Sequence, residues 1–161
     1  MAQFIYLFDE RDLSRIKKNG IKKSKYNAFD GVYLFPQTEN YEVNHQWMRE
    51  LKRRNSLNML AARIRIPDDT PVLIGKYNSE HIEVTAAKAI GIAREHEDPL
   101  GLEVIALRKI EPKEIISFYK PPKVTGWRYY PAAKGVKPCG CEYCQRGEPY
   151  SKRIKLEYEN T

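Results

Sequence analysis

A single carboxylate stands at the head of an apolar stretch in the second half of the chain. In the segment LEVIALRKIEPKEI, Glu103 is flanked by Leu102 and Val104. The apolar run predicts a strand over 102–107, and a carboxylate inside a strand is costly unless it is paired or takes part in chemistry. Two interpretations stay open: Glu103 is a catalytic group, or it lies at the strand end beside Gly101 and reaches solvent.

The three cysteines of the chain all fall within six positions, as the pattern C-x-C-x-x-C. Cys139, Cys141 and Cys144 lie in a segment rich in proline and glycine, where thiolates one or two residues apart are able to meet on one zinc ion. A tetrahedral site needs a fourth ligand, and the candidates are His45, His81, His96 and a water molecule. Of these, His45 is our first choice. The alternative is three reduced thiols with no metal, or with one transient disulfide between two of them.

Aromatic and basic residues alternate just before the cysteines. In the stretch TGWRYYPAAKG, Trp127, Tyr129 and Tyr130 surround Arg128. Such interleaving is typical of a surface that stacks nucleic-acid bases and pairs arginine with phosphate. It is also typical of an aromatic anchor that fastens an irregular segment to a core, which is the commoner role of such residues.

The composition favours a globular protein with an anionic partner. The 161 residues suit one domain, and the formal charge is +7. Lysine and arginine cluster near residues 17–25, 49–54 and 152–155, which predicts either binding of nucleic acid or another polyanion, or merely solvated faces. No apolar run approaches the ~20 residues that span a membrane. The start of the chain has no basic region before its apolar segment, so we expect a cytoplasmic protein without a secretory signal.

Hydrophobic periodicity predicts an α+β domain. The expected strands cover residues 3–8, 31–35, 59–66, 72–74, 102–107 and 115–119, with 3–8, 31–35, 59–66 and 102–107 as the central ones. The expected helices cover residues 9–19, 42–54 and 79–95, with Gly20 ending the first, and residues 22–30 are expected to form a basic loop. Proline and glycine recur from Lys120 onward. We therefore expect a single domain made of an α+β core, residues 1–119, and an irregular tail, residues 120–161, that carries the cysteines.

Four stretches carry a resemblance to a known superfamily. The strand IYLFD, the helix DLSRIKKNG and the strand GVYLFP, followed later by LEVIALRKIEPKEI, resemble the ADP-ribosyltransferase-like fold. This superfamily includes mono-ADP-ribosyltransferases, poly(ADP-ribose) polymerases and RNA 2′-phosphotransferases. The resemblance implies a fold of mixed sheets with flanking helices, and NAD as cofactor. Longer runs, such as NHQWMRELKRR and CGCEYCQRGE, are similar to those of a group of small bacterial proteins, a likeness that implies no particular activity.

The resemblance also implies roles for particular residues. Glu103 matches the glutamate that binds the nicotinamide ribose and stabilises the oxocarbenium-like transition state. Tyr33 matches the tyrosine that stacks near the nicotinamide ring; from the residues alone, an ordinary strand aromatic is the other interpretation. The first strand departs from the family pattern, because Leu7 stands where a histidine or arginine holds the adenosine ribose or a phosphate. Arg11, or a lysine of the 22–25 loop, would then have to take over this contact.

Two functions from different classes follow. The first is an ADP-ribosyltransferase-like enzyme that transfers ADP-ribose from NAD to a nucleic-acid or protein acceptor. The second is a non-catalytic, basic, zinc-stapled module that binds nucleic acid. A Glu103 side chain that points into the protein favours the enzyme, and one in solvent favours the module.

Overall fold

The computed structural model describes residues 1–26, 29–48, 51, 58–77 and 79–121. These residues form a mixed α+β structure dominated by antiparallel strands. The strands are β1 (Ala2–Asp9), β2 (Ser24–Tyr26), β3 (Phe29–Pro36), β4 (Met59–Ile66), β5 (Pro71–Lys76), β6 (His81–Thr85), β7 (Leu102–Ala106) and β8 (Ile115–Tyr119). The helices are η1 (Glu10–Asp12), α1 (Leu13–Asn19), α2 (Tyr41–His45), α4 (Ala86–Glu95) and η2 (Pro112–Glu114).

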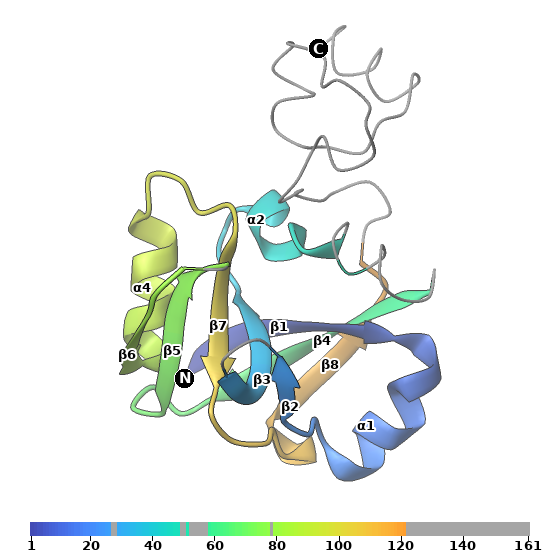
Figure 1. The fold of residues 1–161 in the computed structure, drawn as a ribbon. Helices are drawn as coiled ribbons and strands as arrows, with labels where there is room; N and C mark the ends of the chain where they lie inside the picture. The colour runs from blue at the N-terminus through green and yellow to red at the C-terminus, as the bar shows by residue number, and fades with distance from the viewer. Residues whose placement is uncertain (27–28, 49–50, 52–57, 78, 122–161) are drawn as a thin grey trace, which may run out of the picture.

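The strands join in one sheet whose order is β6-β5-β7-β3-β1-β4-β8, with β2 paired to β3. The four strands that the sequence predicts as central, β7, β3, β1 and β4, are neighbours at its centre. The sheet is strongly twisted, so that β5 and β7 run at a steep angle to β1 and β4 (Figure 1). Its two halves meet at a short pairing of β1 with β3, in which Phe4 opposes Pro36 and Ile5 opposes Phe35.

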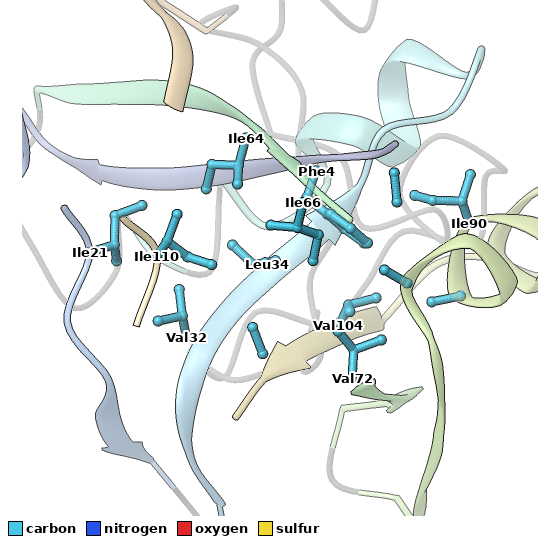
Figure 2. Packing of buried hydrophobic residues seen from close by; sticks show 14 of the residues in the cluster. Phe4, Ile21, Val32, Leu34, Ile64, Ile66, Val72, Ile90, Val104 and Ile110 are labelled. Atoms are coloured by element: carbon cyan, nitrogen blue, oxygen red, sulfur yellow. The ribbon is translucent and has the colours of Figure 1, made fainter. Parts of the chain in front are cut away.

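The main core lies on one face of this twisted sheet. Because side chains alternate along a strand, all the core residues that β1, β3, β4, β5 and β7 contribute have even numbers. They include Phe4, Leu34, Ile64, Val72 and Val104, from both halves of the sheet. Figure 2 shows them converging with Ile90 of α4. We call this the even face.

A second apolar cluster lies on the opposite, odd face. It consists of Ile5, Leu7, Phe35, Trp47, Met48, Met59 and Ala61. The segment that includes α2 covers this part of the odd face, because the Trp47 ring stacks on Phe35 with the ring centroids 5.8 Å apart. Both faces of the central strands are therefore buried, which explains why β7 is buried along its whole length.

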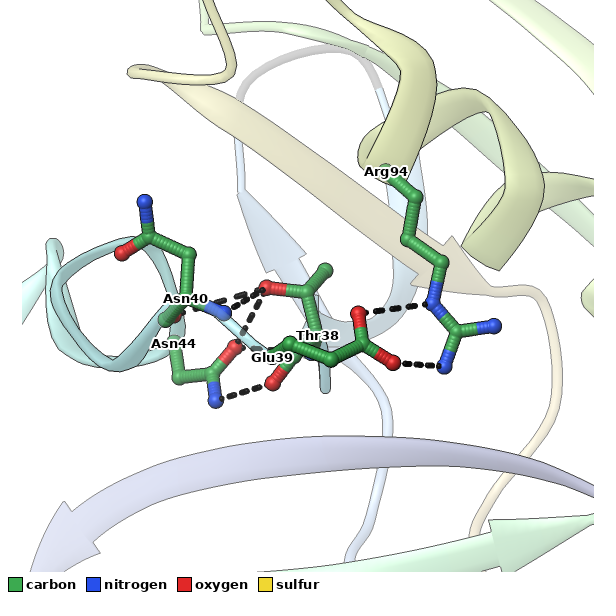
Figure 3. Close-up of polar contacts among 5 residues, drawn as sticks. All are labelled: Thr38, Glu39, Asn40, Asn44 and Arg94. Atoms are coloured by element: carbon green, nitrogen blue, oxygen red, sulfur yellow. Dashed lines mark hydrogen bonds and ion pairs between the residues drawn. The ribbon is translucent and has the colours of Figure 1, made fainter.

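Side-chain bonds fix the turn that leads into α2. Asn44 Oδ1 accepts from the backbone N–H of Thr38 at 2.8 Å, and Asn44 Nδ2 donates to the Thr38 carbonyl at 2.8 Å. Asn40 Oδ1 caps the helix by accepting from Val43 N at 3.2 Å. In Figure 3 the neighbouring Glu39 carboxylate reaches the Arg94 guanidinium of α4. The covering segment is thus tied both to itself and to α4.

The predicted helices were less accurate than the strands. The first is confirmed in extent, as η1 followed by α1, and it ends at Gly20, whose φ of 73° suits glycine. The helix predicted over 79–95 is wrong for its first third, because residues 81–85 form β6 and the helix begins only after Thr85. Thr85 caps α4, since its hydroxyl accepts from Lys88 N at 3.3 Å.

One further prediction is wrong, and two concern residues that are only partly described. The expected basic loop 22–30 contains β2 and the start of β3. In the helix expected over 42–54, α2 ends at His45 before a turn at 46–47, Met48 and Leu51 are again helical, and residues 49–50 and 52–57 are not described. The tail from 122 onward, with the aromatic stretch and the cysteines, also lies outside the described residues. Within the described part of the chain, none of the helices has the length and apolar character to cross a membrane.

Candidate functional site

Glu103 lies inside the protein, on the odd face of β7. It is 5% exposed, so the interpretation of a strand-end carboxylate that reaches solvent is wrong. The start of its strand is held by the covering segment. Gln46 Oε1 accepts from the backbone N–H of Gly101 at 2.5 Å, and Trp47 Nε1 donates to the Leu102 carbonyl at 2.9 Å. These two bonds fix the backbone directly before Glu103.

The partner of Glu103 comes from a strand that is not adjacent to β7. His81 Nε2 lies 3.2 Å from Glu103 Oε1, and both side chains are buried. β6 and β7 are separated by β5, where Gly75 opposes both His81 and Glu103 (Figure 1). A Cβ atom at position 75 would lie 2.8 Å from His81 Cγ. The two side chains meet across β5 because a glycine stands between them.

An aromatic wall from β3 borders the pair. The Phe29 ring lies 5.0 Å from the His81 ring, centroid to centroid. Tyr33 opposes Ile105 on β7, which places Tyr33 diagonally next to Glu103 on the odd face. The Tyr33 hydroxyl donates to the Phe29 carbonyl at 3.4 Å. The structure therefore brings together Glu103 and Tyr33, the two residues to which the resemblance gives roles at the nicotinamide end of NAD.

Burial changes the acidity of both groups. It raises the pKa of Glu103 from its ordinary value to about 7, because a buried carboxylate loses its hydration. Burial, and then the nearby Glu103 charge, raise the pKa of Tyr33 to about 12. At neutral pH the tyrosine is therefore a neutral phenol, while Glu103 is close to the midpoint of its titration. A carboxyl in this state is able either to carry a negative charge or to hold a proton, which is typical of groups that take part in chemistry.

Arg11 and Leu7, the residues that concern the other end of NAD, contact residues other than Glu103 and Tyr33. Arg11 is exposed and bound to Asp9, with Nε–Oδ1 and Nη2–Oδ2 distances of 2.9 and 3.1 Å. Leu7 is buried in the second cluster on the odd face of β1. The first strand thus presents an apolar side chain at the position where the family pattern has a polar anchor.

The predicted metal site is described only at its histidine. His45 is buried, with Nε2 2.8 Å from the Tyr119 hydroxyl, and the Arg63 guanidinium lies 5.0 Å from the centroid of the Tyr119 ring. Cys139, Cys141 and Cys144 lie outside the described residues. Within the residues that are described, no three side chains of the metal-binding types His, Cys, Asp and Glu gather at one point.

His81 is the residue of this site whose contact with Glu103 the sequence did not predict. From the sequence, His81 is a candidate zinc ligand within an expected helix. The sequence HIEVT does carry the missing signal, because Ile82 and Val84 alternate with polar residues and Thr85 is β-branched, a pattern typical of a strand. A strand register over Gly75 would have placed His81 on the same face as Glu103.

A comparison with models of known protein families finds no match to this chain, and a search of curated proteins finds no match either.

Proposed function

We propose that this chain is an ADP-ribosyltransferase-like enzyme that cleaves NAD between nicotinamide and ribose and transfers ADP-ribose to an acceptor. The observation that carries the proposal is the burial of Glu103 on the odd face beside Tyr33. The strands that bear the resemblance also support it, because β1, β3 and β7 are consecutive in the sheet. Three stretches far apart in sequence thus come together at one place.

The chemistry assigned to Glu103 follows from its surroundings. As nicotinamide leaves, positive charge builds on the ribose, and a fixed carboxylate nearby stabilises that charge most strongly where water is excluded. Glu103 is buried, and its backbone is held by Gln46 and Trp47. Tyr33, kept neutral by its raised pKa, offers a ring face on which nicotinamide stacks. Arg11 remains the proposed contact for the phosphates or the adenosine ribose, and it would have to exchange Asp9 for NAD.

The test is release of nicotinamide from NAD, measured chromatographically with nucleic-acid and protein acceptors. Glu103→Gln keeps the size of the side chain but removes its charge, so the rate should fall on the order of 10²–10³-fold while NAD affinity changes little. Tyr33→Ala should instead weaken NAD binding. Glu83→Gln is the matched control, because Glu83 is an exposed carboxylate on β6, and its rate should equal that of wild type. A wild-type protein that neither binds NAD nor releases nicotinamide would refute the proposal.

The cysteine-rich tail is proposed to bind zinc. Cys139, Cys141 and Cys144 would supply three thiolates, and His45 is the proposed fourth ligand. Binding of zinc at His45 Nε2 would require this atom to leave the Tyr119 hydroxyl. Metal analysis of freshly purified, reduced protein should find one zinc per chain, and a Cys141→Ser variant should lose it. Metal-free wild-type protein would rule out the site.

A non-catalytic binding module is the second candidate. The observation that favours it is a group of exposed lysines on α1 and the residues after it, namely Lys17, Lys18, Lys22 and Lys25. Lys17 also lies over the Phe118 ring, with Nζ 5.6 Å from its centroid, so this surface combines charge with an aromatic group. Binding of single-stranded nucleic acid that weakens steeply with salt, in a protein that leaves NAD intact, would favour the module over the enzyme.

A further inference from the structure

His81 and Glu103 form a pair that must be considered as one unit. Among the described residues, His81 is the hydrogen-bonding partner of the Glu103 side chain, and it approaches only one of the two carboxylate oxygens, Oε1. The exposed fractions of the two side chains are 3% for His81 and 7% for Glu103. In such a dry setting, a mismatch of donors and acceptors would cost free energy that solvent could not restore.

The hydrogen-bonding partner of the other ring nitrogen determines how many protons the pair holds. His81 Nδ1 lies 2.9 Å from the Ser79 carbonyl oxygen, which only accepts, so Nδ1 carries a hydrogen. A neutral imidazole with its hydrogen on Nδ1 has a bare Nε2. A bare Nε2 facing an ionised Glu103 would place two acceptors against each other. One proton therefore lies between Nε2 and Oε1, either on the carboxyl group or on the ring.

Among the described residues packed around His81 and Glu103, no other side chain takes up this proton. On the odd face, β5 contributes Gly75 and Leu73, and β7 contributes Ile105, none of which titrates. β3 contributes Tyr33, a neutral phenol at neutral pH, together with the Phe29 ring.

The remaining titratable groups lie on β6 and in the turn before it, where Tyr77 donates its backbone N–H to the Gly101 carbonyl and packs edge-on against the Trp47 ring. Glu83 on β6 and Glu80 in the turn are exposed, so water screens their charges. From the turn, Ser79 supplies its backbone carbonyl as the acceptor for His81 Nδ1. Within the described residues, the partner closest to Glu103 that can accept its proton is thus His81.

We propose that His81 is the positioning residue of this site, which sets the charge of Glu103 by sharing one proton with it. When the proton moves from Oε1 to Nε2, the O–H bond breaks and an N–H bond forms, so the neutral pair becomes an imidazolium next to a carboxylate without exchange with solvent. Oε2 then faces the substrate with a negative charge. His81 holds Oε1 in place throughout, as the orienting member of a catalytic pair does.

This inference rests on the proposed function for its consequence. The nicotinamide of NAD is a cation that leaves as a neutral ring, so the step needs a charged carboxylate and no proton donor. A cationic ring beside the pair favours the form with the proton on His81. The pair is therefore suited to a reaction in which the ring beside Glu103 is a cation that leaves as a neutral group, as in the cleavage of oxidised NAD.

The first experiment is independent of turnover. Nitrogen NMR of ¹⁵N-labelled full-length protein reports whether Nε2 of each histidine is bare or protonated, and the His81 signal is assigned as the one missing from His81→Asn. We expect the Nε2 signal of wild-type His81 to lie between the two limits at neutral pH. It should move to the bare position in Glu103→Gln and stay unmoved in the control Glu83→Gln. A wild-type signal at the bare position, the same as in Glu103→Gln, would overturn the proposal.

The second experiment tests the consequence. In His81→Asn, kcat for nicotinamide release should fall about 10–100-fold, as for other partners that orient a functional side chain, with NAD binding little changed. The pH dependence of kcat should also change in shape, because the proton has lost its second acceptor. Unaltered kcat and pH profile in a folded His81→Asn would refute the positioning role. If wild type shows the shared proton but no NAD turnover, the proposed function fails while the proton pair stands.

Discussion

The two faces of the sheet are built from alternate residues of the same strands, yet they differ in kind. The even face is an apolar core from edge to edge. Among the described residues, the buried polar or charged ones are Asn44, His45, Gln46 and Glu103. Glu103 lies on the odd face, and the other three belong to the segment that covers it. Buried polarity is thus confined to one side of the sheet.

Because of this difference, the even face supplies most of the folding free energy, while the groups able to take part in chemistry lie on the odd face. An apolar face gains free energy from every methylene that it buries, at about 25 cal/mol per Å². Buried polar groups return little unless each finds a partner, and a carboxylate near the midpoint of its titration is a cost to the folded state. This unfavourable free energy arises on the odd face, and burial of apolar side chains on the even face offsets it. Neighbouring residues of one strand should therefore respond in opposite ways to substitution.

The largest effect is expected for a truncation on the even face. Leu34 is fully buried, so Leu34→Ala should lower the free energy of unfolding by about 2–5 kcal/mol. Its neighbour Tyr33 points to the odd face, and its hydroxyl donates a long bond to the Phe29 carbonyl, so Tyr33→Phe should change the same quantity by less than about 1 kcal/mol. Urea denaturation of both variants measures the contrast. Equal losses would show that the two faces contribute alike.

The next effect is a pH dependence that belongs to Glu103. Its pKa is raised to about 7 in the folded protein, from an ordinary value near 4.5. Between these two values the folded protein holds a proton on Glu103 that the unfolded chain releases. The contribution of Glu103 to the free energy of unfolding is therefore fully present below about pH 4.5 and is lost as pH rises to about 7. The loss is about 3 kcal/mol at most. In Glu103→Gln this slope should vanish, and since other carboxyls act equally in both proteins, the difference between the two isolates Glu103 together with His81, its partner. Parallel curves would contradict the assignment.

Most of the fold was predictable because the alternation of apolar and polar residues marks a strand within its own short stretch of sequence. Leu60, Ala62, Ile64 and Ile66 alternate with Arg63 and Arg65, and β4 places this even-numbered set against the main core. The burial of Glu103 was only half predictable. Its sequence shows a carboxylate in an apolar run, but the partner that makes burial tolerable comes from a strand two positions away in the sheet.

The partner was missed for a physical reason. An alanine-rich helix follows β6 directly, and its strong helical pattern extended the prediction backward across β6. The short run HIEVT was overridden, although it is stabilised as a strand by its five pairings with β5. Tertiary pairing decided the conformation of this segment, which a local pattern does not report. The role of Gly75 depends on that pairing and was invisible for the same reason.

A smaller effect is expected where a side chain is added between the pair. In Gly75→Ala the new Cβ would lie 2.5 Å from the Glu80 carbonyl oxygen and 2.8 Å from His81 Cγ. The turn and the ring must both shift, and overpacking of this kind costs about 1–3 kcal/mol. The Nε2 signal of His81 should also lose its intermediate position as the ring leaves Glu103. A stable variant with an unchanged His81 signal would show that β5 yields easily and that the glycine is not required for the contact.

The smallest effect, and one of opposite sign, is expected for a glycine that separates nothing. Gly91 lies within α4, and a Cβ there would meet no atom within 4 Å. Glycine inside a helix costs backbone entropy relative to alanine, so Gly91→Ala should raise the free energy of unfolding by about 0.5–1 kcal/mol. The His81 signal and nicotinamide release should stay as in wild type. Paired with Gly75→Ala, this variant makes the same chemical change in both places, so a loss at position 75 against a gain at position 91 is due to the side chains that meet across β5. A destabilised Gly91→Ala would mean that α4 tolerates no added bulk, and the contrast would lose its control.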